Sequence, residues 1–163
     1  MTRLDSVIRR LMAQRSLLDW AARHIARTPG LVLELGLGNG RTYDHLRERL
    51  PGREIYVFER APAAHPTCMP PDDRLIVGDI FATLPDFIAR FGAGSAVLVH
   101  ADIGTGNQAE NEKLAARLSP LIAQLLAPGG LMVADRPFDL PDCIDVSAEA
   151  DVEPGRYFVY RCR

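Results

Sequence analysis

The sequence predicts an α/β protein whose mostly parallel sheet of seven strands is covered by helices on both faces. Three observations lead to this prediction. Short apolar runs alternate with longer segments of helical periodicity. The runs are apolar throughout, as in strands that are buried on both faces of a parallel sheet. A glycine-rich stretch joins the first run to the following helix, which is typical of sheets that bind nucleotide-like molecules.

The N-terminal segment, residues 1–28, is predicted to be a helical extension. Its apolar residues recur at helical spacing, at Leu4, Val7, Ile8, Leu11, Leu18, Ala21, Ala22 and Ile25. Because Ser16–Asp19 has the form of a capping box, the segment forms one helix or two helices that meet near Ser16. We expect its apolar face to be buried, against the cofactor site or a second subunit, and its arginines to face solvent. These are Arg3, Arg9, Arg10, Arg15, Arg23 and Arg27.

The remaining elements follow in a regular order between residues 30 and 163. Strands are predicted at 31–35, 54–59, 74–79, 96–100, 131–134, 143–147 and 156–162, and helices at 41–50, 81–91 and 108–127. Residues 61–72 contain four prolines and no periodicity, so they are predicted to be a loop. Pro128–Gly130 is predicted to be a turn before the fifth strand.

Composition narrows the class of protein. A chain of 163 residues with 47% hydrophobic and 25% charged residues fits one globular domain, residues 1–163. The net charge of −2 gives no electrostatic case for nucleic acid as a partner. No apolar run reaches the roughly 18 residues that a membrane span needs. Cys68, Cys143 and Cys162 are odd in number and widely spaced, so we expect reduced thiols in a cytoplasmic protein.

The stretch Leu31–Thr42 carries the clearest functional pattern. It reads Glu34-x-Gly36-x-Gly38-x-Gly40 between a strand and a helix. A dinucleotide fingerprint would need glycine where Arg41 stands, and no Gly-Lys-Ser/Thr of a P-loop follows. The glycines let a ligand approach the backbone, and the helix that follows offers unpaired N–H groups to an anionic group.

Polar residues stand at the ends of four successive strands. They are Glu34, Glu59, Asp79, and the pair His100 and Asp102. Ligands of open α/β sheets bind beyond these carboxyl ends. Glu59 follows Gly40 by 19 residues, the position at which a carboxylate accepts ribose hydroxyl groups.

Together with Gly78-Asp79-Ile80 and Leu126–Gly130, these motifs make the chain similar to the class I S-adenosylmethionine-dependent methyltransferases. The resemblance covers residues 30–135 by motif and 136–163 by topology. It implies a three-layer Rossmann-like sandwich with sheet order 3-2-1-4-5-7-6 and an antiparallel strand 7. It also implies S-adenosyl-L-methionine as cofactor.

The resemblance implies roles for individual residues. The three glycines would run beside the methionine part and ribose of the cofactor, with Glu34 near its ammonium group. Glu59 would hold the ribose, Asp79 the adenine amino group, and Ile80 would pack on the ring. The expected cofactor-binding residues are Glu34, Gly36, Gly38, Gly40, Thr42, Glu59, Arg60, Gly78, Asp79, Ile80 and Asp102. Structural alternatives are a loop-bracing role for Glu34 and a helix N-cap for Asp79.

His100 and Asp102 are the candidates for a general base, if the acceptor holds its proton at neutral pH. Structural roles are the alternatives for both. Val99–Asp102 and Ala134–Arg136 resemble the cation-binding segments of catechol-type O-methyltransferases. Arg136 occupies a ligand position there, and because arginine repels a cation, no metal is expected.

Few residues lie outside the predicted core, so the acceptor is expected to be a small molecule or to bind in a pocket completed by a second subunit. A homo-oligomer, with a homodimer favoured, is therefore expected. The rival interpretations are a dehydrogenase-type dinucleotide enzyme and a non-catalytic protein that binds S-adenosylmethionine.

Overall fold

The computed structural model describes residues 2–150 and 152–163. Its centre is a seven-stranded sheet of order β3-β2-β1-β4-β5-β7-β6. All pairs are parallel except those of β7, which runs antiparallel to β5 and β6. The strands are β1 (Leu31–Leu35), β2 (Ile55–Glu59), β3 (Leu75–Val77), β4 (Ala96–Ala101), β5 (Leu126–Ala134), β6 (Cys143–Asp145) and β7 (Phe158–Cys162). The expected fold class and strand order are confirmed.

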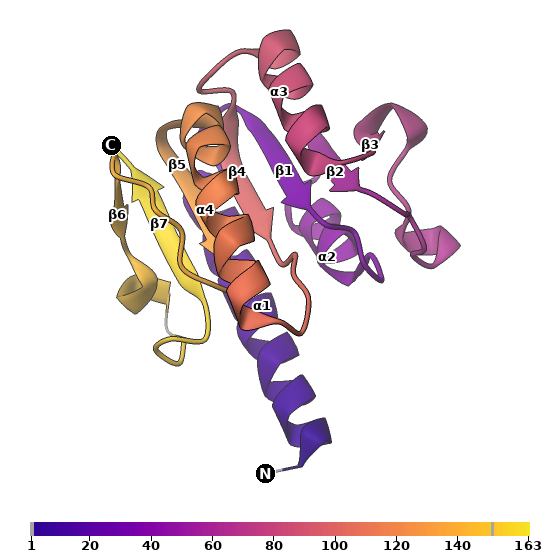
Figure 1. The fold of residues 1–163 in the computed structure, drawn as a ribbon, viewed down its shortest axis with the longest axis vertical. Helices are drawn as coiled ribbons and strands as arrows, with labels where there is room; N and C mark the ends of the chain where they lie inside the picture. The colour runs from indigo at the N-terminus through magenta and orange to yellow at the C-terminus, as the bar shows by residue number, and fades with distance from the viewer. Residues whose placement is uncertain (1, 151) are drawn as a thin grey trace.

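Helices cover both faces of the sheet (Figure 1). Those on one face are α1 (Arg3–Ile25) and α2 (Arg41–Arg49), and those on the other are α3 (Ile80–Phe91) and α4 (Gln108–Leu125). Short 3-10 turns stand at Pro66–Cys68, Asp72–Arg74 and Ser147–Ala150. Each face has its own apolar core, because strand side chains alternate between the faces.

Helix α1 is one continuous helix, so no break occurs at Ser16. The capping box forms instead at its start, where Thr2 and Asp5 cap each other. Asp19 pairs with His45 and Arg49 of α2. The second half of α1 packs into the core through Leu17, Leu18, Ala21 and Ile25.

The first half of α1 projects beyond the body of the protein (Figure 1). Leu4, Val7, Ile8 and Met12 are 68, 43, 46 and 54% exposed. The expected burial of Leu4, Val7 and Ile8 is therefore not found within this chain. Near the projection, Arg9 forms an ion pair with Glu153, with 2.6 Å between the nitrogen and oxygen.

The segment Pro128–Gly130 lies within β5 rather than ahead of it. The register between β4 and β5 passes from Ala96–Leu126 to Leu98–Leu131, so extra residues on β5 form an irregular bulge there. Helix α4 ends directly at this strand. The residues predicted to form a turn before the fifth strand are thus part of an irregular bulge near the start of β5.

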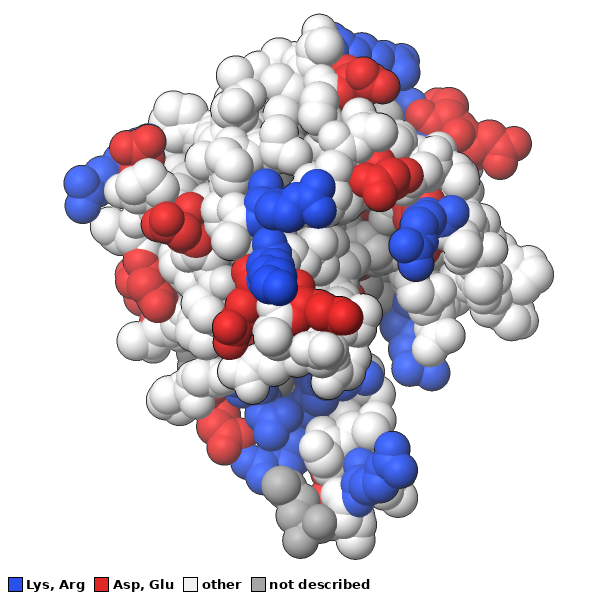
Figure 2. All heavy atoms as spheres, in the orientation of Figure 1, with Lys and Arg blue, Asp and Glu red and all other residues white. Residues whose placement is uncertain are grey.

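Charged side chains of both signs are interspersed over the face that α4 covers, with no broad patch of one sign (Figure 2). In the part of the chain that the structure describes, no helix is both long enough and apolar enough to cross a membrane.

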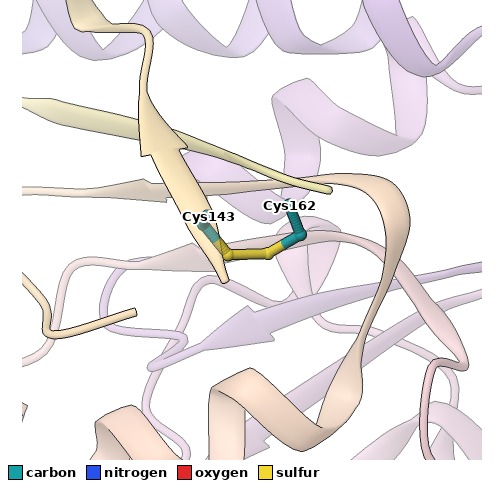
Figure 3. Close-up of a disulfide and its surroundings, with 2 residues drawn as sticks. All are labelled: Cys143 and Cys162. Carbon is teal, nitrogen blue, oxygen red and sulfur yellow. A yellow bond between two sulfur atoms is a disulfide. The ribbon is translucent and has the colours of Figure 1, made fainter. Parts of the chain in front are cut away.

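The expectation of three reduced thiols is wrong for two of them. Cys143 and Cys162 form a disulfide between β6 and β7, with 3.8 Å between the Cα atoms (Figure 3). The two residues are 19 positions apart in sequence. The antiparallel pairing places them directly opposite each other, which spacing alone does not reveal. Cys68 is a free thiol.

Candidate functional site

The glycine-rich loop leaves β1 in backbone conformations that suit glycine. Gly36 has a φ of +92°, and its N–H donates to the carbonyl of Phe58 at 2.8 Å. A Cβ at Gly36 would lie 2.2 Å from the Ile103 side chain, and one at Gly40 would lie 2.7 Å from the Cys68 carbonyl. Nothing lies within 4 Å of a Cβ built on Gly38, so that residue faces open space. The loop is therefore packed tightly at both ends and accessible at its middle.

Glu34 and His100 form a buried pair on neighbouring strands. They are cross-strand partners of β1 and β4, are 1% and 0% exposed, and lie 2.7 Å apart between a carboxylate oxygen and Nδ1. Burial alone would lower the pKa of His100, but the Glu34 carboxylate outweighs burial and raises this pKa. Thr42 donates to the other oxygen of Glu34. The pair therefore anchors the start of α2 to the middle of the sheet.

Glu59 braces the loop from the end of β2. One carboxylate oxygen accepts the N–H groups of Leu37 and Gly38 at 2.9 and 3.3 Å, and the other accepts that of Ala61 at 3.0 Å. Burial would raise the pKa of Glu59, but these N–H groups outweigh it and lower the pKa. The Arg60 N–H also lowers this pKa, so backbone donors surround both oxygens of the Glu59 carboxylate.

A cleft runs along the carboxyl ends of the strands in two connected chambers. The first, of about 430 Å³, lies between the glycine loop and the start of α3. Eight of the predicted cofactor residues line it: Gly36, Gly38, Glu59, Arg60, Gly78, Asp79, Ile80 and Asp102. The second chamber, of about 370 Å³, lies between the glycine loop and α1 and shares Gly36, Gly38 and Asp102. Thr42 lines this second chamber.

Three predicted site residues do not line the cleft. Glu34 and His100 are enclosed in the sheet, and Gly40 is covered by the 64–68 segment. Asp79 does line the first chamber, and it also caps α3 by accepting the N–H of Phe81 at 2.8 Å. Asp79 can therefore be both the N-cap of α3 and a residue of the cleft, because the cap uses only one of its two carboxylate oxygens.

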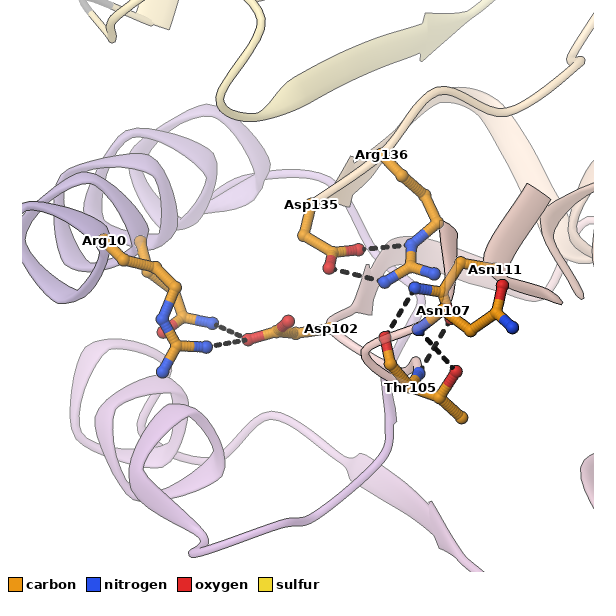
Figure 4. Close-up of polar contacts among 8 residues, drawn as sticks. Arg10, Asp102, Thr105, Asn107, Asn111, Asp135 and Arg136 are labelled. Carbon is orange, nitrogen blue, oxygen red and sulfur yellow. Dashed lines mark hydrogen bonds and ion pairs between the residues drawn. The ribbon is translucent and has the colours of Figure 1, made fainter. Parts of the chain in front are cut away.

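Asp102 lies where the two chambers meet and is held by α1 (Figure 4). Gln14 donates to its carboxylate at 2.7 Å, and a nitrogen of Arg10 lies 3.8 Å away. The side chain of Asp102 remains 26% exposed. Arg10 is exposed, as expected for the arginine face of α1, and it also lines the second chamber.

Asp135 and Arg136 form a two-pronged ion pair after β5. The Arg136 Nε and one terminal nitrogen donate to the two oxygens of Asp135 at 2.8 and 2.7 Å (Figure 4). This hydrogen-bonded carboxylate raises the pKa of Arg136. Within residues 2–150 and 152–163, no group of three His, Cys, Asp or Glu side chains comes together in a way that could hold a metal ion.

Sequence reasoning missed several residues of the second chamber. They are Arg10, Gln14, Asn39, Arg41 and Thr105. Asn39 and Arg41 lie within the glycine-rich loop, so their place in the sequence could have identified them as residues of the site. Arg10 and Gln14 carried none, because only the packing of α1 brings them to the cleft.

A family model described as S-adenosyl-L-methionine methyltransferase matches residues 1–162. The chain belongs to this family of methyltransferases. A crystal structure of an S-adenosyl-L-methionine methyl transferase from Silicibacter pomeroyi DSS-3 is 46% identical, with a TM-score of 0.90 over 100% of this chain and 99% of that one. No curated protein matches the sequence.

More distant structures share the fold of this methyltransferase. Human methyltransferase-like protein 13, in complex with SAH, is 15% identical, with a TM-score of 0.55 over 93% of this chain and 79% of that one. The Burkholderia thailandensis 1,6-didemethyltoxoflavin-N1-methyltransferase is 16% identical, with a TM-score of 0.52 over 92% and 78%.

The cofactor of the methyltransferase is S-adenosyl-L-methionine. The residues that line the cleft also fit the chemical groups of this molecule. The first chamber combines an exposed glycine backbone with the Glu59 carboxylate and the apolar Ile80 and Phe81. The second adds Arg41 and the start of α2, which favour a carboxylate group.

Proposed function

We propose that this enzyme transfers the methyl group of S-adenosyl-L-methionine to a small molecule without a metal ion, and that residues 1–163 act as one domain. The observation that carries the proposal is that eight of the predicted cofactor residues, which lie at the ends of β1, β2, β3 and β4 or at the start of α3, line one chamber. That chamber adjoins a second one, which shares Asp102 with it and is also lined by Asp135 and Arg136. The whole cleft is small, which favours a small acceptor over a macromolecule.

In this proposal the first chamber holds the adenosine. Glu59 accepts a ribose hydroxyl, Asp79 faces the adenine amino group, and Ile80 lies beside the ring. Arg60 and Gly78 complete the wall, and Thr42 helps to enclose the methionine part. When bound, the cofactor supplies an electrophilic methyl group, and the electron pair of the broken carbon–sulfur bond stays on sulfur. The protein contributes mainly alignment, which can supply most of the rate effect.

Asp102 is the proposed general base for an acceptor that holds its proton. Its carboxylate is partly exposed at the junction of the chambers, and Gln14 fixes its position. His100 is not proposed as a base, because its ring is buried against Glu34. Both His100 and Glu34 are proposed to act by positioning α2 and the glycine loop.

The function is tested by isothermal titration of the protein with S-adenosyl-L-methionine and with NAD. We expect binding of the first and none of the second, because Arg41 occupies the third glycine position of the dinucleotide motif. Binding of NAD without binding of S-adenosyl-L-methionine would overturn the proposal.

Removal of divalent cations is expected to leave cofactor affinity and methyl transfer unchanged. The physical reason is that Arg136 places its positive charge directly beside Asp135, where a cation would have to bind. Transfer of isotope-labelled methyl groups, measured with and without EDTA, checks this. Activity that is lost with EDTA and restored by Mg²⁺ would contradict it.

We also infer a homodimer built on the exposed apolar stripe of α1, which consists of Leu4, Val7, Ile8 and Met12. Replacing all four by serine is expected to produce a monomer in analytical ultracentrifugation, because the stripe is too apolar to stay exposed on a projecting helix. The matched control replaces Val77 and Ile144, which are exposed apolar residues on edge strands. An unchanged mass for the stripe variant, or a monomeric parent protein, would disprove the inference.

A cytoplasmic location remains a prediction from the sequence. The Cys143–Cys162 bond bears on it, because cytosolic thiols are usually reduced. Mass spectrometry of alkylated protein from intact cells decides between the bonded and reduced forms.

A further inference from the structure

A third cavity lies beside the proposed cofactor cleft. It is a groove of about 740 Å³ between the first turns of α4 and the connection from β5 to β6. Its apolar lining comes from Ala115, Ala116, Pro137 and Phe138. This volume is in the range of pockets that take small organic molecules. None of the cofactor residues predicted from sequence lines it.

The groove adjoins the second chamber through shared residues. Asp135 and Arg136 line both cavities, so their ion pair stands as a partition between them. The Arg136 guanidinium lies between Asp135 and the side chains of Thr105, on the loop before α4, and Asn111, in the first turn of α4 (Figure 4). The groove thus adjoins the part of the second chamber that Asp135 and Arg136 line.

The balance of charge reverses across this partition. The second chamber carries the guanidinium groups of Arg10, Arg41 and Arg136 against two carboxylates, an excess of one positive charge. The groove carries the carboxylates of Glu112, Asp135 and Asp139 against Arg136 alone, an excess of two negative charges. Asp135 takes two donors of Arg136, and the remaining terminal nitrogen of Arg136 is buried without a hydrogen-bond partner among the described residues. The carboxylates of Glu112 and Asp139 are exposed at the groove.

We propose that this groove is the acceptor site and that its ligand is a small apolar molecule bearing an ammonium group. The ammonium group anchors the ligand, and a different atom of the ligand, which carries a free lone pair, takes the methyl group. The inference rests on the proposed function, since the groove gains its role from the neighbouring cofactor cleft. The apolar floor takes a ring or alkyl part, and Glu112 and Asp139 attract the ammonium group. An organic anion is repelled by the same carboxylates, which gives the site its selectivity.

Three probes of equal size test the charge preference: benzylamine, benzyl alcohol and benzoate. Each is titrated into isotope-labelled protein saturated with S-adenosylhomocysteine, and the backbone amide signals of Ala115, Ala116 and Phe138 are followed. Benzylamine is expected to shift these signals with the highest affinity and benzoate with the lowest. Equal or stronger binding of benzoate, or an absence of benzylamine shifts at these residues, would overturn the proposal.

The double variant Glu112→Gln, Asp139→Asn is expected to weaken benzylamine binding about three- to tenfold, as for two partly exposed charge pairs. The control is Glu48→Gln, Asp86→Asn, which removes two exposed carboxylates from α2 and α3 and should change nothing. Unchanged affinity for benzylamine in the groove variant would contradict the inference.

Titration of the same samples with S-adenosylhomocysteine separates this inference from the proposed function. Failure to bind S-adenosylhomocysteine counts against the proposed function, whereas its binding with a groove that prefers anions counts only against this inference.

Discussion

Replacing Glu34 by alanine is expected to lower the free energy of unfolding by about 3–5 kcal/mol, the usual effect of leaving a buried charge without its partner. His100 is fully enclosed and its Nδ1 faces the Glu34 carboxylate at 2.7 Å. Without that carboxylate, the ring must stay buried unpaired or lose its proton. Urea unfolding measures the change.

A double-mutant cycle supplies the control for this prediction. The double variant Glu34→Ala, His100→Ala should be less destabilised than the two single changes added together, because the unpaired charge is gone. Strict additivity would show that the two side chains do not interact. Loss of the Thr42 hydrogen bond is common to both Glu34 variants and cancels in the comparison.

The same pair sets a pH dependence. Because the folded-state pKa of His100 is raised, the pair's contribution is fully present below the unfolded pKa of about 6.5 and is lost as pH rises through the folded value. The free energy of unfolding is therefore expected to fall on the alkaline side of pH 6.5. In a His100→Asn variant this part of the slope should vanish, and an unchanged slope would contradict the assignment.

Replacing Glu59 by alanine is expected to weaken binding of S-adenosyl-L-methionine by about 1.5–3 kcal/mol, the scale of a hydrogen bond to a charged group. Two effects add. The ribose loses its acceptor, and the glycine loop loses the carboxylate that holds the N–H groups of Leu37 and Gly38. Glu59→Gln should cost less, because one oxygen acceptor remains.

Isothermal titration measures this loss, and circular dichroism shows whether the variant remains folded. The matched control is Glu54→Ala, which removes a carboxylate just before the opposite end of the same strand. Wild-type affinity in a folded Glu59→Ala protein would show that the ribose assignment is wrong. A loss of the same size in the Glu54 control would show that the effect is not local to the cleft.

Local pattern was enough to predict the strands, the helices and the glycine loop, because periodicity and turn residues act over short distances. The sheet order came from the resemblance carried by the Glu34–Gly40 motif and the later strand ends. The strand pattern also put Glu59 and Asp79 at strand ends, and both line the first chamber, since residues that follow parallel strands meet at one edge of the sheet. Their roles toward the cofactor stay predictions.

Contacts between distant segments were beyond the sequence alone. Gln14 holds Asp102 across 88 positions, which depends on how α1 lies over the sheet. The burial of His100 against Glu34 depends on the register of β1 and β4, and the Cys143–Cys162 bond depends on that of β6 and β7. A shift of one residue would turn these side chains to the opposite face.

Helix α1 joins two regions that would otherwise be independent. Its 23 residues form one rod about 34 Å long, with an exposed apolar tip, an anchored base, and Arg10 and Gln14 at the cleft between them. Whatever restrains the tip also restrains the position of Asp102. If restraint of the tip changes the affinity of the cleft for its ligand, thermodynamic linkage requires that occupation of the cleft change the affinity of the tip for its partner by the same factor. With such coupling, a dimer formed through the stripe would bind its cofactor with an apparent affinity that varies with protein concentration.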